Sequence, residues 1–346
     1  MKNFYYQFIL SGLLLMSLQC SAQDLHFSQF YETAILRNPA LTGVFTGDYK
    51  VGVMYRNQWS SISNPYQTGL VSAEARNNVG NANDFVSYGM VAYFDRAGSI
   101  DLQTLAVYPA ISYNKSINDN HSSFISVGFT GAYMQNSFAA NKATFNNQYQ
   151  NNSYNPANAT GETLPTPHIY NWDMGAGVAF NTSAGSNNEF TYIIGASGYH
   201  FSTPQNSFYK NAAITLQMRW NVNGGLSWQI NETYSLLLQA NYLQQGQYKE
   251  IMAGGLLSWT QREQGSEAVA FGLAGGFFYR YDDAIVPVVK IKYKDYSFGV
   301  SYDVNISTLK AASVMRGGYE ISVFKTGIFS NASQDRGKTI CPTNFF

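Results

Sequence analysis

The feature that most restricts the fold of this chain is a period-two alternation of side chains from residue 49 onward. In residues 170–181, YNWDMGAGVAFN, one face carries Tyr, Trp, Met, Ala, Val and Phe, and the other carries Asn, Asp, Gly and Ala. The segments 123–134, 234–242 and 296–303 repeat the pattern. Because successive side chains of a strand point to opposite faces, each segment is predicted to be a β-strand with one apolar face.

The length and number of these segments indicate strands that cross a membrane. They are about 9–12 residues long, which suits a tilted crossing, and the apolar face often carries an aromatic residue at one or both ends. About fourteen are predicted, an even number as in single-chain bacterial barrels. They lie near residues 49–58, 67–76, 84–95, 102–115, 122–135, 170–181, 189–200, 218–230, 234–244, 249–259, 267–280, 284–293, 296–304 and 317–329.

The composition separates two all-β alternatives. Charged residues make up 12% of the chain, which is about half the usual share, while aromatic residues make up 16%. A soluble propeller or sandwich would carry more charge on its second face. We therefore expect the fold class to be all-β, a transmembrane antiparallel β-barrel in the outer membrane.

The connections sort by position, which is a second argument for a barrel. With a periplasmic N-terminus, the turns after even-numbered strands are periplasmic, and all of them are short. The long connections, 136–169, 201–217 and 305–316, all follow odd-numbered strands and are expected to be extracellular.

The N-terminus resembles a secretory signal, with Lys2, a short apolar stretch and the small residues before Gln23. Lipidation at Cys20 is the alternative, but the preceding Gln19 is not small. The predicted organisation is a signal peptide at 1–22, a periplasmic helical segment at 23–48, a barrel at 49–329 and a periplasmic tail at 330–346.

Residues 26–43, HFSQFYETAILRNPALTG, depart from the strand pattern. Apolar residues recur at helical spacing in Phe27, Phe30, Tyr31, Ala34 and Ile35, and an Asn-Pro pair then ends the run. We expect a short helix that plugs or covers the periplasmic mouth, because a barrel of this width is not filled by its own wall. A helix on the membrane surface and a helix that docks a partner are the alternatives.

A search for reactive groups finds no catalytic, cofactor-binding or metal-binding residue. The four His are scattered, and no metal-ligand spacing, nucleophile elbow or phosphate loop occurs. Asp282 and Asp283 are expected in a turn rather than at a metal. The net charge is zero, so no nucleic acid partner is expected. Charged residues within the strands suggest cross-strand pairs in the lumen or near the periplasmic rim, with a selectivity ring as the alternative. They are Arg56, Glu74, Arg280, Lys290 and Lys292.

Two stretches carry a resemblance to a known family. Residues 23–59 contain the block NPALTG followed by YRNQW, and residues 277–322 contain YDVN. Together they resemble the PorP/SprF family of the Bacteroidetes type IX secretion and gliding system. The resemblance implies an outer-membrane barrel without enzymatic activity or cofactor. It implies as partners a secreted surface adhesin or other type IX substrate, periplasmic lipoprotein or ring components, and outer-membrane lipid.

Three functions are compared. The expected one is a secretion-system partner that helps export or anchor an adhesin; the alternatives are a passive porin or small-solute transporter, and an outer-membrane enzyme. The strands carry few charged residues, which favours the secretion-system partner over a porin. The lack of a catalytic motif argues against an outer-membrane enzyme. The candidate contacts with the adhesin are aromatic residues of the long loops, namely Phe138, Phe145, Tyr149, Tyr154 and Phe208. In the alternative, these side chains pack on each other and close the top of the barrel.

Overall fold

The structure is a computed structural model that describes residues 24–329 apart from 61–63, 81–82, 119–122, 164, 263–268 and 309. The predicted signal peptide and the predicted C-terminal tail, with both cysteines, lie outside the described residues. Within the described ranges, no helix has the length and apolar character that a membrane crossing needs.

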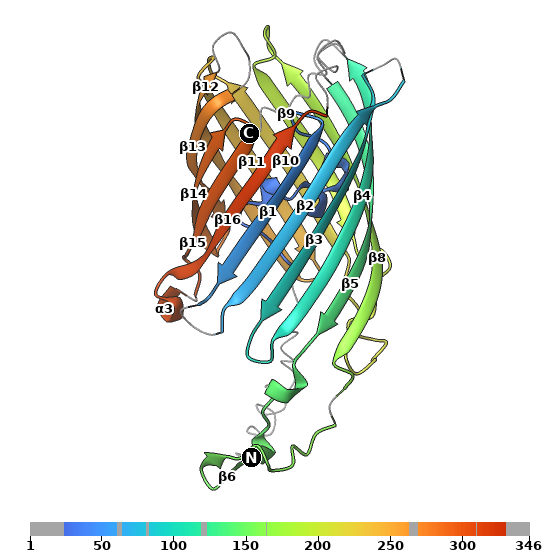
Figure 1. The fold of residues 1–346 in the computed structure, drawn as a ribbon, viewed down its shortest axis with the longest axis vertical. Coiled ribbons are helices and arrows are strands. Elements are labelled where there is room, and N and C mark those ends of the chain that lie inside the picture. Colours follow the sequence, from blue (N-terminus) through green and yellow to red (C-terminus); the bar gives the residue numbers. More distant parts are fainter. Residues whose placement is uncertain are drawn as a thin grey trace, which may run out of the picture.

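Fourteen antiparallel strands form one closed barrel (Figure 1). This confirms the predicted fold class and the predicted strand number. The strands are β1 (Tyr49–Gln58), β2 (Tyr66–Asn78), β3 (Phe85–Ala97), β4 (Leu102–Asn118), β5 (Ser123–Ser137), β8 (His168–Ala184), β9 (Phe190–Tyr199), β10 (Arg219–Gln229), β11 (Tyr234–Gln245), β12 (Tyr248–Arg262), β13 (Val269–Arg280), β14 (Ala284–Tyr293), β15 (Tyr296–Asn305) and β16 (Arg316–Gly327).

The barrel closes between its first and last strands. Strand β1 pairs with β2 on one side and with β16 on the other, where Tyr49 lies opposite Gly327 and Gln58 lies opposite Gly318. Closure leaves no strand edge in the ring, so the backbone groups of the wall can all be paired. A bilayer core offers no water to satisfy them otherwise.

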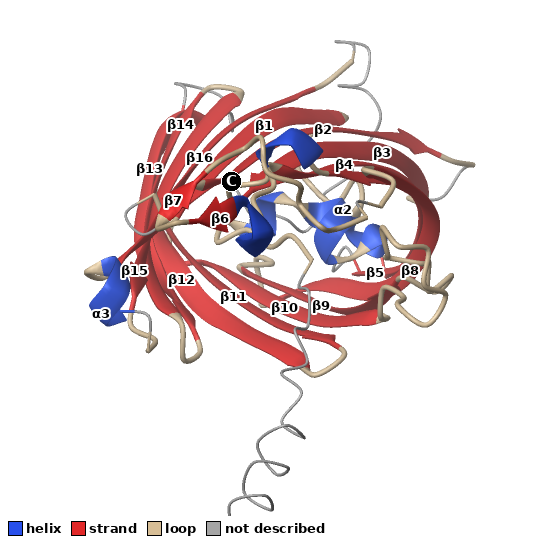
Figure 2. Cartoon of the chain, turned by 90° about the horizontal axis from the view of Figure 1, so that it is seen from below, coloured by secondary structure: helices blue, strands red, loops and turns tan. Residues whose placement is uncertain are grey.

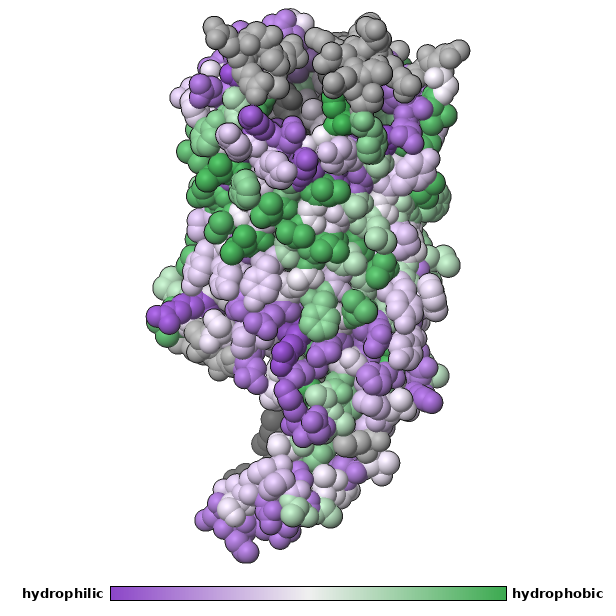
Figure 3. Space-filling model, viewed as in Figure 1, coloured by the Kyte–Doolittle hydropathy of each residue, from purple (hydrophilic) through white to green (hydrophobic). Residues whose placement is uncertain are grey.

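The alternation of side chains sorts them between lipid and lumen as predicted. On β8, Trp172 is 74% exposed and Met174 is also exposed, whereas Asn171 and Asp173 are buried inside. On the face of the barrel seen in Figure 3, apolar residues form a band across the middle, with more hydrophilic zones toward both ends. The wall therefore presents the apolar band that a membrane-spanning barrel requires.

The two ends of the barrel differ, and we name them by their connections. The loop end carries the long connections 138–167, 200–218 and 306–315, and the turn end carries connections of two to six residues. The first of these long connections extends away from the barrel as an arm (Figure 1), which we define as residues 138–167. Within the arm, β6 (Tyr149–Gln150) and β7 (Ser153–Tyr154) pair as a small hairpin.

Helices are short and few among the described residues. The arm contains η3 (Ala140–Lys142) and η4 (Asn146–Gln148), and the last long connection contains α3 (Lys310–Ser313). Three more precede the barrel and lie inside the ring of strands (Figure 2). These are η1 (Phe30–Glu32), α2 (Ala34–Arg37) and η2 (Pro39–Leu41).

Candidate functional site

The most distinctive internal feature is a lumen segment, which we define as residues 24–48. Its first described residue, Asp24, pairs with His200 and Arg219, next to the loop ends of β9 and β10. Its last residue, Asp48, donates its backbone N–H to Gly327 at the turn end. The segment therefore runs the length of the barrel from inside. From the sequence, this segment is expected at or in the barrel mouth next to the start of β1. The structure instead places the start of the segment near the loop end, at the opposite mouth.

The predicted helix over this segment is divided into short turns. The extended backbone of Asn38, with φ −163°, ends α2 after four residues, as the following proline requires. The Asn38 side chain then accepts a hydrogen bond from Ala40 N at 2.9 Å and caps η2. Helices this short are not stable alone in water, so contacts with the wall must hold their shape.

The predicted apolar stripe faces two opposite walls instead of one. Phe27 and Ile35 belong to a buried cluster with side chains of β1–β5 and β16, including Met54 and Phe324. Phe30 and Tyr31 pack on Phe278 of β13, with ring centroids 5.5 and 5.3 Å apart. Apolar burial on both sides favours a segment that fills the space between two walls.

Charged strand residues near the loop end bind the start of the segment. Glu320 accepts the backbone N–H groups of Ser28 and Gln29 at 2.6 and 2.8 Å. Arg56 lies opposite Glu320 in the ladder and pairs with it at 3.0 Å, and it pairs with Asp303 at 3.3 Å. The predicted cross-strand pairing is thus present for Arg56. Its carboxylate partners also bind the segment, Glu320 through backbone N–H groups and Asp303 through the Ser28 hydroxyl.

A second charged contact lies nearer the turn end. The carboxylate of Glu32 bridges Lys290 of β14 at 2.5 Å and Lys50 of β1 at 2.9 Å. All three side chains are largely buried. One carboxylate of the segment therefore pairs with lysines of two different strands, β14 and β1.

We expect Glu32→Gln to lower the free energy of unfolding by about 3–5 kcal/mol, since it removes the carboxylate that pairs with two buried ammonium groups. Urea unfolding of the purified barrel, followed by tryptophan fluorescence, measures the change. Glu162→Gln in the exposed arm is the control and should change nothing. A loss below about 1 kcal/mol would mean that water solvates this contact.

Polar contacts also hold the centre of the segment. Arg37 donates to the side chains of Gln239 and Asn241 at 2.9 and 3.2 Å and to the carbonyl of Ala240 at 3.0 Å. Arg37 is buried, and within the described residues it has these amide partners rather than a carboxylate. Its charge is held by dipoles of β10 and β11.

Glycines of the wall make room for the Asn-Pro break. A Cβ atom built on Gly128 of β5 would collide with the backbone of Pro39, and one built on Gly177 of β8 would collide with the Asn38 side chain. One built on Gly195 of β9 would lie 2.6 Å from Asn38 Nδ2. These three glycines form the niche that seats the break, which explains why Gly recurs on the lumen face of neighbouring strands.

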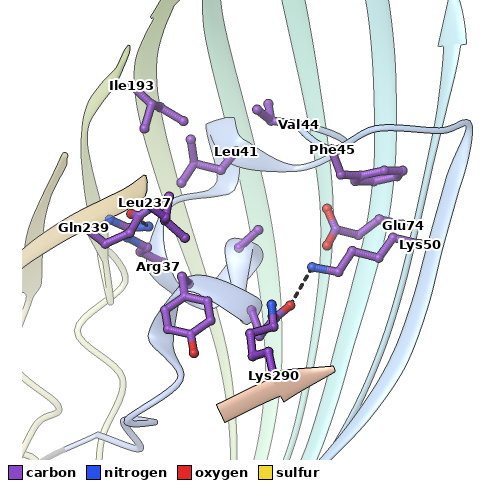
Figure 4. Close-up of a pocket in the computed structure, with 13 residues that line it drawn as sticks. Arg37, Leu41, Val44, Phe45, Lys50, Glu74, Ile193, Leu237, Gln239 and Lys290 are labelled. Atoms are coloured by element: carbon purple, nitrogen blue, oxygen red, sulfur yellow. Dashed lines mark hydrogen bonds and ion pairs between the residues drawn. The ribbon is translucent and has the colours of Figure 1, made fainter. Parts of the chain in front are cut away.

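A small cavity lies between the segment and the wall. One cavity of about 60 Å³ lies beside the segment, bordered by Arg37, Leu41, Phe45, Glu74 and Lys290 among others (Figure 4). This volume is enough for a few water molecules. Nearby, Glu74 accepts the backbone N–H of Gly43 at 2.9 Å, so another strand carboxylate binds the segment.

The candidate loop aromatics fall into two groups. Phe138 and Phe208 pack edge to face, with centroids 4.9 Å apart, which joins the arm to the connection 200–218. Phe145 is half-buried beside η4, while Tyr149 and Tyr154 are exposed on the hairpin. The structure therefore brings two of the five together and leaves two tyrosines open at the far part of the arm.

The base of the arm is fastened to a neighbouring turn. Lys142 and Arg96 reach Asp101 at 2.5 and 2.6 Å, and Ala139 N donates to Ile100 O at 2.8 Å. The hydrogen bonds from Lys142 and Arg96 lower the pKa of Asp101 below its ordinary value. These contacts fix where the arm leaves the barrel.

No group of three or more His, Cys, Asp or Glu side chains that could hold a metal ion occurs within the described ranges. The charged groups of the lumen instead pair with the segment and with each other. No sequence motif predicts this arrangement. The sequence features that accompany it are glycines on the lumen face and charged residues within strands.

A closed, lipid-facing barrel of fourteen strands with a segment inside its lumen is an outer-membrane protein of the secretion or transport type. The family model of the type IX secretion system membrane protein PorP/SprF matches residues 19–324. The chain belongs to this family, which confirms the resemblance carried by its two ends.

Solved structures are similar in fold. The toluene transporter TbuX of Ralstonia pickettii has a TM-score of 0.51 at 9% identity, over 85% of this chain and 93% of that chain. A FadL homologue of Pseudomonas aeruginosa has a TM-score of 0.49 at 10% identity, over 84% and 93%. At these identities the likeness concerns the barrel alone. No curated protein matches the sequence.

Proposed function

We propose that this chain is a docking component of the type IX secretion system, which binds an exported surface adhesin at its loop end and helps to export or anchor it. The loop end faces the cell exterior in this proposal. The turn end then faces the periplasm, where lipoprotein or ring components of the system are the expected partners.

The observation that carries the proposal is the occupied lumen. A passive porin needs a water-filled route from end to end, whereas the lumen segment here runs through the barrel and contacts the wall on both sides. The segment is tied to the wall by ion pairs at Asp24 and Glu32. We infer that the segment acts as a plug and that the barrel serves as a support rather than as a conduit.

The arm supports the docking part of the proposal. It presents Tyr149 and Tyr154, which are 59% and 46% exposed, within a stretch rich in Asn and Gln. Tyrosines among adaptable polar side chains provide large contact area with flexible hydrogen bonding. Phe138 and Phe208, which pack on each other, serve instead to brace the arm.

The test is co-purification of partners from detergent-solubilised outer membrane, with mass spectrometry. We expect one surface protein to co-purify with the wild type. Tyr149→Ala and Tyr154→Ala should each weaken its binding by about 2 kcal/mol, or about 30-fold, because central aromatic side chains dominate such contacts. Tyr170→Ala, on the lipid-facing side of β8, is the matched control. Equal recovery with every variant would contradict the assignment of these tyrosines.

A further inference from the structure

The outer surface at the turn end carries a compact group of aromatic and basic residues on four neighbouring strands and their ends. We call it the rim patch and define it as Tyr49, Tyr293, Lys294, Tyr296, Lys325 and Phe329. In the ladder, Tyr293 lies opposite Tyr296, and Tyr296 lies opposite Lys325. Tyr49 lies opposite Gly327, two residues beyond Lys325. The patch therefore crosses the seam where the barrel closes.

The two lysines of the patch rest on tyrosine rings. Lys325 Nζ lies 5.3 Å from the centre of the Tyr296 ring and also interacts with the hydroxyl groups of Tyr296 and Tyr49. Lys294 Nζ lies 5.8 Å from the centre of the Tyr293 ring. Such contacts hold each ammonium group beside a tyrosine ring. Lys294 is exposed, and Lys325 is half-buried.

Two carboxylates border the patch. Asp48 Oδ2 accepts the backbone N–H of Phe329 at 3.1 Å, and Asp295 follows Lys294 in the turn between β14 and β15. Neither lysine of the patch forms an ion pair with any residue the structure describes. At the same end of the barrel, Lys115 is neutralised by Asp84 at 2.8 Å.

An apolar surface adjoins the patch on the side of the membrane centre. Val51, Ile291 and Phe298 follow along the same strands, point outward and are 40–43% exposed. Going from the membrane centre to the turn end, the wall thus changes from apolar side chains to a zone of tyrosines and lysines, in which Lys325 lies opposite Val51 and Tyr296. This change suits a phospholipid, whose acyl chains lie toward the membrane centre and whose headgroup lies at the interface.

We propose that the rim patch is a binding site for an anionic phospholipid of the phosphatidylglycerol type. Lys325 and Lys294 bind the headgroup phosphate, the hydroxyl groups of Tyr296 and Tyr49 donate hydrogen bonds to it, and the acyl chains lie along β14, β15 and β1. The positive charges of the patch select an anionic headgroup over a zwitterionic one. A lipid bound there holds the first and last strands together across the seam.

The test is lipid binding by the purified barrel in detergent, measured by native mass spectrometry with added phosphatidylglycerol or phosphatidylcholine. The wild type should prefer phosphatidylglycerol. Lys325→Gln and Lys294→Gln should each lower its affinity for phosphatidylglycerol about fivefold, and the double variant about 30-fold, with no change for phosphatidylcholine. Lys249→Gln, an exposed lysine near the loop end of β12, is the matched control and should bind as the wild type does.

Two further measurements keep the test decisive. Heat-dependent migration on a gel must show a folded barrel for each variant, and Lys325→Arg should retain most of the preference because the charge remains. Inorganic phosphate at millimolar concentration should not displace the lipid. Unchanged affinity in the double variant, equal binding of both lipids by the wild type, or full displacement by inorganic phosphate would each overturn the proposal.

Discussion

Deleting residues 24–38 is expected to turn a barrel with little conductance into an open channel. The deletion removes no strand, so the ladder from β1 to β16 stays complete. It removes the part of the lumen segment that fills the space between β1–β5 and β11–β14. In planar bilayers, single-channel conductance should rise roughly tenfold or more, because a polar lumen of this width then fills with water.

The deletion also leaves Glu320, Asp303 and Lys290 without their partners from the segment. Water that enters the emptied lumen can solvate these groups, so we expect the barrel to remain folded. A second variant avoids the deletion: Gly177→Leu places a bulky side chain where Asn38 sits and should displace the segment. Gly69→Leu is the matched control, because Gly69 lies on the outward face of β2 and a Cβ atom added there meets no atom within 4 Å.

Wild-type conductance in both the deletion and Gly177→Leu would contradict the plug assignment. If partner binding were lost at the same time, the segment would have a docking role instead. If conductance rose in the deletion alone, the niche at Gly177 would tolerate displacement of Asn38 without release of the segment. Each result therefore places the segment in one role.

The wall of the barrel could be predicted because its constraint is local and repeats. Every strand must alternate between lipid and lumen, so residues such as Trp172 and Asp173 reveal their faces without knowledge of their neighbours. The parity of the connections then fixes which ends lie together. Strand boundaries within 201–230 are harder to predict, since residues 200–218 form no barrel strand and carry an isolated bridge between Gln205 and Thr215.

The route of residues 24–48 could not be predicted, for a physical reason. Helical spacing of Phe27, Phe30 and Ile35 indicates that these side chains are buried, but not that they face opposite walls. Several binding partners of the segment are more than 200 residues away, as in the pair of Ser28 and Glu320. Such contacts depend on the register of the closed ladder, which the pattern of a single segment does not contain.

The lumen charges show the same limit. From the sequence, Arg56, Arg280 and Lys290 are expected to pair with residues of other strands. The sequence pattern does not indicate that carboxylates of the lumen segment bind strand cations. Glu32 and Asp24 nevertheless bind strand cations directly. The observation that could have pointed to them is glycine on the lumen face, since Gly128 and Gly177 serve no turn and leave space that something must occupy.

Shortening the arm is expected to abolish surface display of one specific type IX substrate while the barrel stays folded. Replacing residues 143–160 by a Gly-Ser turn removes the hairpin with Tyr149 and Tyr154. It keeps Phe138, which packs on Phe208, and Lys142, which binds Asp101. The brace at the base of the arm therefore remains, and the loss concerns the exposed part alone.

The size of the effect follows from the two tyrosines. If each contributes about 2 kcal/mol to the contact, their joint loss weakens binding by about 4 kcal/mol, or nearly a thousandfold. Surface proteomics of whole cells measures display, and heat-dependent migration reports folding of the shortened barrel. A matched variant shortens the connection 306–315, which lies at the same end but lacks exposed tyrosines.

The two variants separate recognition from closure of the barrel. If the arm acts as a lid, its loss should raise conductance and leave every type IX substrate on the surface, which would contradict the docking role. If the arm recognises the adhesin, display of one substrate should fail while conductance stays low, because the lumen segment still fills the barrel. Failure of display in both shortened variants would assign recognition to the whole loop end rather than to Tyr149 and Tyr154.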